Sequence, residues 1–140
     1  MIVWDTNVVS ELMRPEPDEL VVAWADRQSA SEVFITAITL AELWYGIGRL
    51  PMGRRRNELA EVFDEMLTED FERRVLDFDR VAAAHHADLV VERERIGRPI
   101  SLADAQIAAI CRSHGAAIAT RNVDDFADVG VDIMNPWTDS

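Results

Sequence analysis

Four short segments of the sequence place acidic or amide side chains beside apolar runs, at points where a helix or strand is expected to begin or end. These side chains are Asp5, Glu42, Asp104, Asn122 and Asp125. Carboxylates gathered at one place repel one another and lose hydration, so they need a cation to stay ionised. Only oxygen ligands are available in these segments, which favours Mg²⁺ or Mn²⁺ over zinc. The pattern therefore predicts a metal-dependent phosphodiesterase.

The elements that must position these side chains alternate between short apolar runs and helical patterns. Strands are expected at Ile2–Trp4, Val33–Ile35, Val75–Leu76, Ala117–Ala119 and Asp132–Met134. Helices are expected at Val8–Met13, Glu19–Arg27, Leu40–Leu50, Arg55–Leu67, Arg80–Ile96 and Leu102–His114. This alternation is typical of βαβ units and a parallel sheet, so the predicted fold class is α/β. Asp5 would then follow the first strand at its carboxyl end, where open α/β sheets bind their ligands.

Length and composition predict one domain that spans residues 1–140. An apolar fraction of 49% suits an ordinary globular core. No apolar stretch approaches the roughly 20 residues of a membrane span, and no basic leader precedes a cleavage site, so we expect a cytoplasmic protein without a membrane partner. The single cysteine, Cys111, fits a reducing compartment, and its place in a helical pattern predicts a core residue.

The formal net charge of −12 argues against a simple electrostatic clamp on nucleic acid. It leaves a nuclease open, because a metal ion can supply positive charge at the scissile phosphate. All 14 basic residues are arginine and none is lysine. Arginine offers a fixed fork of donors that suits phosphate. The absence of lysine excludes sites that depend on one.

Three of the acids also have a structural interpretation. Asp5 can cap the helix that follows it. Thr39-x-x-Glu42 has the form of a capping box, in which the glutamate reaches back to the cap amide, and Ser101-x-x-Asp104 resembles the same device. Asp104, however, shares a helical stripe with apolar residues and is expected to face inward, where an unpartnered carboxylate is costly.

The roles of the polar residues in the last segment, from Asn122 to Asp125, stay open from the sequence alone. Asn122 reads either as the cap of the following turn or as a ligand of a metal-bound water. Asp125 reads either as a solvated turn acid or as a further member of the site, whereas Asp124 is expected to face solvent.

With these residues in place, the chain resembles the PIN-domain ribonucleases, specifically the VapC-type toxins and their FitB-like relatives. The matching segments run nearly end to end: Ile2-Val-Trp-Asp5-Thr-Asn7-Val-Val-Ser10-Glu, Ala37-Ile-Thr39-Leu-Ala-Glu42-Leu, Ser101-Leu-Ala-Asp104-Ala, Ala119-Thr-Arg-Asn122-Val-Asp-Asp125-Phe and Asn135-Pro-Trp137. The resemblance implies a three-layer α/β/α PIN-like domain around a central, mostly parallel sheet. It also implies a Mg²⁺ or Mn²⁺ site, endonucleolytic cleavage of RNA, a homodimer, and a small cognate antitoxin that binds DNA and blocks the site.

The resemblance also implies roles for the individual acids. Asp5, Glu42 and Asp104 match the first three acids of the family. Asp5 and Asp104 would hold the metal directly, and Glu42 would hold it or orient the attacking water. At the fourth position relatives carry Asp or Asn, and here Asn122 occupies it, so Asp125 is a second candidate for part of that role.

Other classes of protein are weaker matches. A phosphoacceptor receiver domain needs a lysine near its last strand, and haloacid-dehalogenase-type phosphatases need Asp-x-Asp where this chain has Asp5-Thr6-Asn7. Two alternatives stay open: a degenerate PIN-like domain that only binds protein or nucleic acid, and a relative that cleaves DNA.

One helical segment is expected to bind the partner. In Leu40–Leu50, a stripe of Leu40, Leu43 and Ile47 is predicted to face the core, so at least one of Trp44 and Tyr45 should be partly exposed. Pro51-Met-Gly53 turns the chain into the next helix, which leaves an apolar groove between the two. Such grooves accept a peptide or an amphipathic helix, so an antitoxin tail is expected there.

Overall fold

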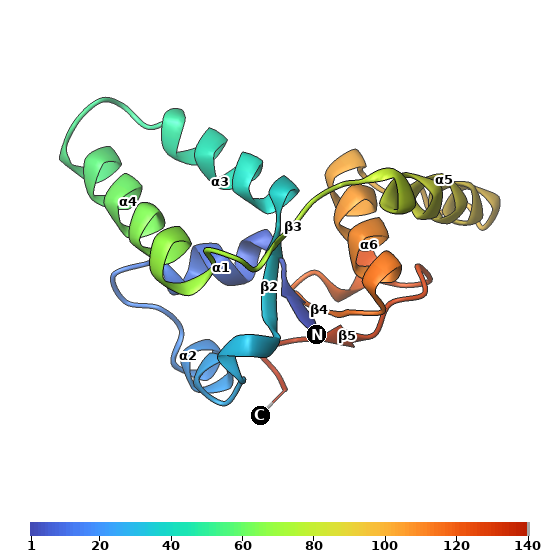
Figure 1. Cartoon of the computed structure of the whole chain (residues 1–140), viewed down its shortest axis with the longest axis horizontal. Helices are drawn as coiled ribbons and strands as arrows, with labels where there is room; N and C mark the ends of the chain where they lie inside the picture. Colours follow the sequence, from blue (N-terminus) through green and yellow to red (C-terminus); the bar gives the residue numbers. More distant parts are fainter. Residues whose placement is uncertain (140) are drawn as a thin grey trace.

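The computed structural model describes residues 1–139 and places five parallel strands at the centre of the molecule (Figure 1). The strands are β1 (Ile2–Trp4), β2 (Val33–Thr36), β3 (Val75–Leu76), β4 (Ala117–Ala119) and β5 (Ile133–Met134). Their order across the sheet is β3-β2-β1-β4-β5, and every neighbouring pair is parallel. The predicted α/β class with a parallel central sheet is confirmed.

Helices cover both faces of this sheet and make the three layers. They are α1 (Thr6–Leu12), α2 (Glu19–Asp26), α3 (Ala37–Gly48), α4 (Arg54–Glu65), α5 (Arg80–Arg95) and α6 (Leu102–His114). Short 3₁₀ turns form at Ala30–Glu32 and Val123–Phe126, and a π-helical turn at Met66–Asp70 continues α4. Helices α1 to α4 lie on one side of the strands in Figure 1, and α5 and α6 lie on the other.

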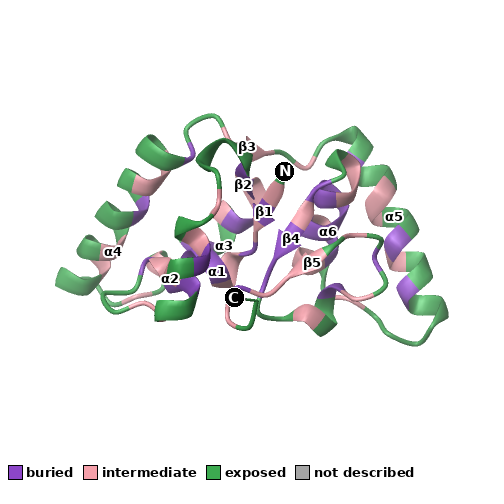
Figure 2. Ribbon diagram, turned by 90° about the horizontal axis from the view of Figure 1, so that it is seen from below, coloured by how far each residue is buried: buried purple, intermediate pink, exposed green. Residues whose placement is uncertain are grey.

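The alternation of side chains along each strand divides the core between the two faces. Val3 and Ile118 pack towards α5 and α6, together with the buried Cys111. The neighbouring Trp4 and Ile35 point to the opposite face, into the clusters formed with α1 to α4. Buried residues follow the strands and the inner helix faces in Figure 2, and exposed residues cover the outer faces. Cys111 is a core residue as predicted, and its burial raises the pKa of the thiol.

The helix beginnings follow from side-chain caps, and one predicted cap is wrong. Ser101 caps α6 as expected, accepting a hydrogen bond from the backbone N–H of Asp104 at 3.3 Å. Helix α3 is capped by Thr36 and not by Thr39, because the Thr36 hydroxyl accepts the N–H of Thr39 at 3.1 Å. Glu42 therefore lies in the second turn of α3, too far along to close a capping box.

Other boundaries differ from the expected ranges by a few residues. Helix α1 begins at Thr6 rather than at Val8, because the Asp5 carboxylate caps the Thr6 N–H. Helix α6 has its expected bounds and is capped at its C-terminal end by Gly115, whose φ of 62° is the left-handed conformation that glycine adopts most easily. Over residues 1–139, every helix is too short or too polar to cross a bilayer.

Candidate active site

The centre of the sheet is a switch point in the chain path. The connection from β1 leads to β2 on one side, whereas β4 pairs with β1 on the other. Asp5 lies directly after β1, and its backbone N–H donates to the carbonyl oxygen of Ala119 in β4 at 2.9 Å. Open α/β sheets bind ligands in the crevice beyond the carboxyl ends of strands at such a point.

Asp5 is the most deeply buried of the candidate acids, with 4% of its surface exposed. One carboxylate oxygen accepts the Thr6 N–H at 2.8 Å, and the other accepts the Thr120 hydroxyl at 2.8 Å. Burial raises the pKa of Asp5 to about 6, against the two hydrogen bonds that lower it. The negative charges of Asp104 and Glu42 add to the rise. Asp5 is thus both the cap of α1 and an acid facing two others.

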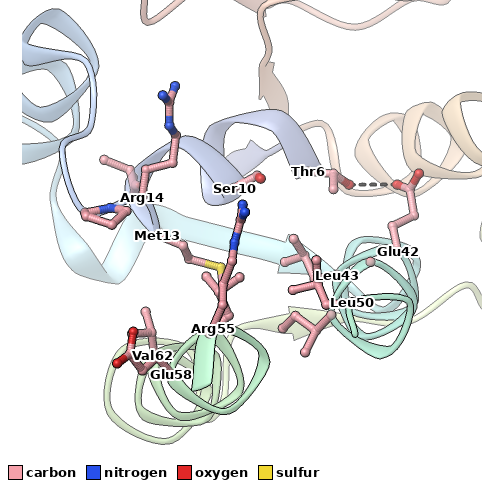
Figure 3. A pocket seen from close by; sticks show the side chains of 15 residues that line it. Thr6, Ser10, Met13, Arg14, Glu42, Leu43, Leu50, Arg55, Glu58 and Val62 are labelled. Atoms are coloured by element: carbon pink, nitrogen blue, oxygen red, sulfur yellow. Dashed lines mark hydrogen bonds between the residues drawn. The ribbon is translucent and has the colours of Figure 1, made fainter. Parts of the chain in front are cut away.

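Glu42 reaches the same place from α3. Its carboxylate accepts a hydrogen bond from the Thr6 hydroxyl at 2.7 Å, which Figure 3 shows as a dashed line. The Thr6 hydroxyl also lies 3.1 Å from that of Thr39, so the first turns of α1 and α3 are joined through hydroxyl groups.

Asp104 is half-buried in the first turn of α6. Burial is the largest cause that raises its pKa, and the charges of Asp125 and Glu42 act in the same direction. The Ser101 hydrogen bond and the charge of Arg93 lower the pKa of Asp104. The inward orientation expected from its helical stripe is therefore only partly realised.

The two remaining candidates lie on the segment after β4. The backbone N–H of Asn122 donates to the Thr120 hydroxyl at 3.0 Å, and Asn122 begins the 3₁₀ turn without a capping bond from its side chain. Asp125 is exposed, and its charge acts on Asp104.

The structure thus brings Asp5, Glu42, Asp104 and Asp125 into one electrostatic neighbourhood. It does not bring them into one coordination sphere: over residues 1–139, no three His, Cys, Asp or Glu side chains lie close enough together to hold a cation as they stand. Glu42 instead accepts the hydrogen bond of the Thr6 hydroxyl, and ionised carboxylates without a cation between them repel one another. The donor set still fits a hard divalent cation, because it consists of carboxylate oxygens, and burial raises the pKa of two of its members, Asp5 and Asp104.

Sequence reasoning missed the neutral residues that hold these acids. Thr120 bonds Asp5 directly, and Asn7 links three groups: its side-chain amide donates to Asp5 at 3.4 Å and to Thr120 at 3.3 Å, while its oxygen accepts the Arg121 N–H at 3.3 Å. The run Asp5-Thr6-Asn7 was the available signal, because three polar residues directly after an apolar strand need partners.

A groove of about 850 Å³ opens beside the acids, between α1, α3 and α4 (Figure 3). Its lining includes Thr6, Ser10, Met13, Glu42, Leu43, Gly46, Ile47, Leu50, Arg55 and Val62. Figure 3 shows Arg55 extending from α4 towards Ser10, with the Thr6–Glu42 pair at the edge of the groove. The predicted groove between the two helices therefore exists, and of the candidate acids Glu42 lines it.

Trp44 and Tyr45, of which at least one was expected to be partly exposed, lie outside this groove. Trp44 and Tyr45 are 56% and 62% exposed, as expected for residues flanking the core stripe, but neither lines the groove. Trp44 packs edge-on against Phe63 of α4, with ring centroids 5.6 Å apart. The Tyr45 ring instead lies under the Arg49 guanidinium.

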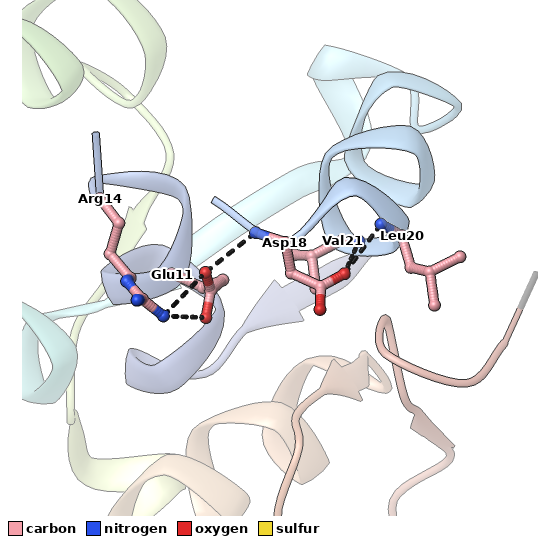
Figure 4. A network of polar contacts seen from close by, with 5 residues as sticks. All are labelled: Glu11, Arg14, Asp18, Leu20 and Val21. Carbon is pink, nitrogen blue, oxygen red and sulfur yellow. Dashed lines mark hydrogen bonds and ion pairs between the residues drawn. The ribbon is translucent and has the colours of Figure 1, made fainter. Parts of the chain in front are cut away.

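A buried glutamate stabilises the turn that forms one wall of the groove (Figure 4). Glu11, at the end of α1, accepts the backbone N–H of Asp18 at 3.0 Å and pairs with the Arg14 guanidinium at 3.3 Å. Asp18 in turn caps α2 through the Leu20 N–H at 2.8 Å. These bonds fix the turn that contributes Arg14 and Pro15 to the groove.

The class of this protein is defined by a parallel α/β sheet with three carboxylates near its switch point, contributed by the N-cap of α1, the second turn of α3 and the first turn of α6. The chain belongs to the PIN-domain family, whose model matches residues 2–132.

Relatives of known name support the same assignment over almost the whole chain. The VapC ribonuclease Y4jK of Sinorhizobium fredii is 42% identical over 137 residues, which cover 98% of each chain. Toxin FitB of Neisseria gonorrhoeae is 40% identical over 139 residues, covering 99% of this chain and 100% of that one. The solved structure of FitAB bound to an IR36 DNA fragment superimposes with a TM-score of 0.94 at 38% identity, covering 100% of this chain and 98% of that one.

Proposed function

We propose that this protein is a Mg²⁺- or Mn²⁺-dependent endoribonuclease and the toxin of a toxin–antitoxin pair, acting as one domain over residues 1–140. The observation that carries the proposal is the buried Asp5 at the switch point, with a pKa raised to about 6 and the charges of Asp104 and Glu42 acting on it. Such a carboxylate is stabilised by a cation. Two relatives that are 42% and 40% identical to this chain over almost its full length are named a ribonuclease and a toxin, respectively.

The side chains of this chain divide the work of hydrolysis. Asp5 and Asp104 would hold the divalent cation, which when bound lowers the pKa of a water molecule and neutralises charge on the phosphate. Glu42 would hold the cation or orient the attacking water through the carboxylate oxygen that does not accept the Thr6 hydroxyl. Thr120 and the Thr6 N–H keep the Asp5 carboxylate in a fixed orientation.

The substrate class is RNA, as the names of the relatives indicate for those proteins. Attack by water on the phosphorus atom does not use the ribose 2′-hydroxyl. With the ribose 3′-oxygen as the leaving group, cleavage should leave 5′-phosphate and 3′-hydroxyl ends. Because the chain carries a net charge of −12, cleavage should depend on the cation far more than on a basic surface.

The proposed partners are a cognate antitoxin and a second copy of this chain. The antitoxin tail is proposed to bind in the groove between α1, α3 and α4, because this groove is apolar along Leu43, Ile47 and Leu50 and includes Glu42 in its lining. A basic side chain of the tail can replace the charge of the cation there. Both proteins would meet in the cytoplasm, where RNA is available.

The test is cleavage of a structured RNA by purified protein with Mg²⁺ or Mn²⁺ and with EDTA. We expect cleavage that EDTA abolishes and that Asp104→Asn reduces by at least about 10³-fold, a loss typical of removing a group that stabilises the transition state. Asp88→Asn, an exposed acid on α5, is the matched control and should cleave normally. RNA binding without cleavage would favour the degenerate binding module, and cleavage of DNA alone would favour the deoxyribonuclease alternative.

A further inference from the structure

A buried arginine lies close to the acid cluster, and the mechanism above does not use it. Arg93, near the end of α5, has only 4% of its surface exposed, although arginine is almost never buried without a paired charge. Over residues 1–139, no carboxylate oxygen lies within 4.0 Å of its guanidinium, since none of the ion pairs includes it. An ion pair therefore does not explain the burial of Arg93.

The hydrogen bonds of Arg93 all go to backbone carbonyl oxygens. Its Nε donates to the carbonyl of Arg98 at 2.7 Å. Its Nη1 donates to the carbonyls of Asp125 at 3.0 Å and of Ala127 at 2.9 Å. Bonds to carbonyl oxygens fix the path of the main chain and leave the side chains of the bonded residues free. The planar fork of donors makes this bridge possible.

The two bridged segments are those that carry Asp104 and Asp125. Arg98 lies on the connection that leads directly into the first turn of α6, where Asp104 sits. Asp125 belongs to the 3₁₀ turn after β4. Arg93 therefore joins the two stretches of backbone that carry Asp104 and Asp125. Its charge lowers the pKa of Asp104, and the charge of Asp125 raises it.

We propose that Arg93 is a positioning residue that sets the spacing of Asp104 and Asp125, and that Asp125 rather than Asn122 is thereby the fourth oxygen ligand of the cation. The inference rests on the proposed function and adds a positioning residue and a fourth ligand to the same site. Asn122 is less suited, because its neutral amide cannot balance the charge of a divalent ion.

The first experiment measures Mn²⁺ affinity by calorimetry and by electron paramagnetic resonance of free Mn²⁺, without RNA. Arg93→Met and Arg93→Lys should both bind Mn²⁺ roughly 10- to 100-fold more weakly than the parent, the loss typical of removing a group that orients a metal ligand. Lysine keeps the charge but cannot span three carbonyl oxygens. With RNA, kcat should fall while KM stays near the parent value, because Arg93 is not placed to touch the substrate.

Arg112→Met is the matched control, because Arg112 also joins α6 to α5, through Glu92 at 3.8 Å, away from the acids. It should leave Mn²⁺ affinity unchanged. If Arg93→Met does not fold, Arg93→Lys decides the matter. Parental Mn²⁺ affinity in folded Arg93→Lys would overturn the proposal, and so would failure of both variants to fold, since Arg93 would then serve the fold alone.

The second experiment compares the two candidates for the fourth ligand. Asp125→Asn should weaken Mn²⁺ binding by roughly 10-fold or more, and Asn122→Ala should change it little. The reverse order would overturn the assignment of Asp125 while leaving the nuclease intact. If the unmodified protein neither binds Mn²⁺ nor cleaves RNA, the proposed function itself fails, and this inference fails with it.

Discussion

Thr120 donates its hydroxyl hydrogen bond to the Asp5 carboxylate over 2.8 Å, and this bond joins residues that are 115 positions apart in the chain. The same hydroxyl oxygen accepts the Asn122 N–H at 3.0 Å. One side chain therefore orients the central acid and anchors the segment that carries Asn122 and Asp125. The orientation of the site depends on a neutral residue as much as on its acids.

Replacing Thr120 with valine should show this dependence. Thr120→Val keeps the shape of the side chain, leaves one Asp5 oxygen with only the longer bond from the Asn7 amide at 3.4 Å, and leaves the Asn122 N–H without its partner. We expect the free energy of unfolding at pH 7 to fall by about 1–3 kcal/mol and RNA cleavage to fall with it. Urea unfolding in EDTA measures the first, with Thr120→Ser as the control that restores the hydroxyl. Equal stability of the valine and serine variants would show that the bond contributes nothing.

Asp5 should make the metal-free protein less stable as pH rises. Its pKa is about 6 in the folded protein against an ordinary value of 3.8, so the folded state holds the proton more tightly than the unfolded state. Below about pH 4 the group has no effect on stability, and between about pH 4 and 6 the free energy of unfolding falls, by a total on the order of 3 kcal/mol. Above about pH 6, Asp5 causes no further fall in the free energy of unfolding.

The corresponding variant is Asp5→Asn, which can still cap α1, since asparagine caps helices as well as aspartate does. In EDTA it should be more stable than the parent at pH 7 and equally stable at pH 4. Urea unfolding at the two pH values tests this, with Asp88→Asn as a surface control. A lower melting temperature of Asp5→Asn at pH 7 would mean that Asp5 serves the helix start and not a cation.

Mg²⁺ or Mn²⁺ should raise the melting temperature of the parent protein. A ligand present at about 100 times its dissociation constant, and bound by the folded state only, adds about 2.7 kcal/mol to the free energy of unfolding. Asp104→Asn should lose most of this increase while keeping its fold, because an amide cannot neutralise the ion. Differential scanning calorimetry with and without the cation measures both effects. An equal rise in parent and variant would remove Asp104 from the site.

Much of the fold could be predicted from the sequence, because its signals are local. The apolar runs of β1 and β4 are bounded by turn residues, and Gly115 marks the end of α6. The residue that caps α3 could not be predicted from local signals. Thr36 and Thr39 are both threonines near the start of one helix, and only tertiary packing decides between them.

The contacts that complete the site are not local and carry no pattern. The bond from Thr120 to Asp5 depends on β4 pairing beside β1. Arg93 lies in a helix rich in charged residues, and nothing in its neighbours along the chain distinguishes it from exposed arginines. Its burial follows only from the return of the segment after β4 to the end of α5. Sequence could therefore name the acids but not the residues that hold them.

The groove beside the acids offers a test of antitoxin binding through a glycine. Gly46 of α3 lines the groove, and a Cβ added there meets no heavy atom within 4 Å. Gly46→Leu should therefore stabilise the helix by about 0.5–1 kcal/mol, since glycine is a poor helix former. It should also fill space that the antitoxin tail needs, and so weaken antitoxin binding while RNA cleavage is retained.

Gly48→Leu is the control, because Gly48 is equally open but does not line the groove. Affinities for the antitoxin by calorimetry should fall by at least about 10-fold, or 1.4 kcal/mol, for Gly46→Leu alone. Undiminished affinity in Gly46→Leu would place the antitoxin elsewhere, with the exposed Trp44 and Tyr45 as the next surface to examine.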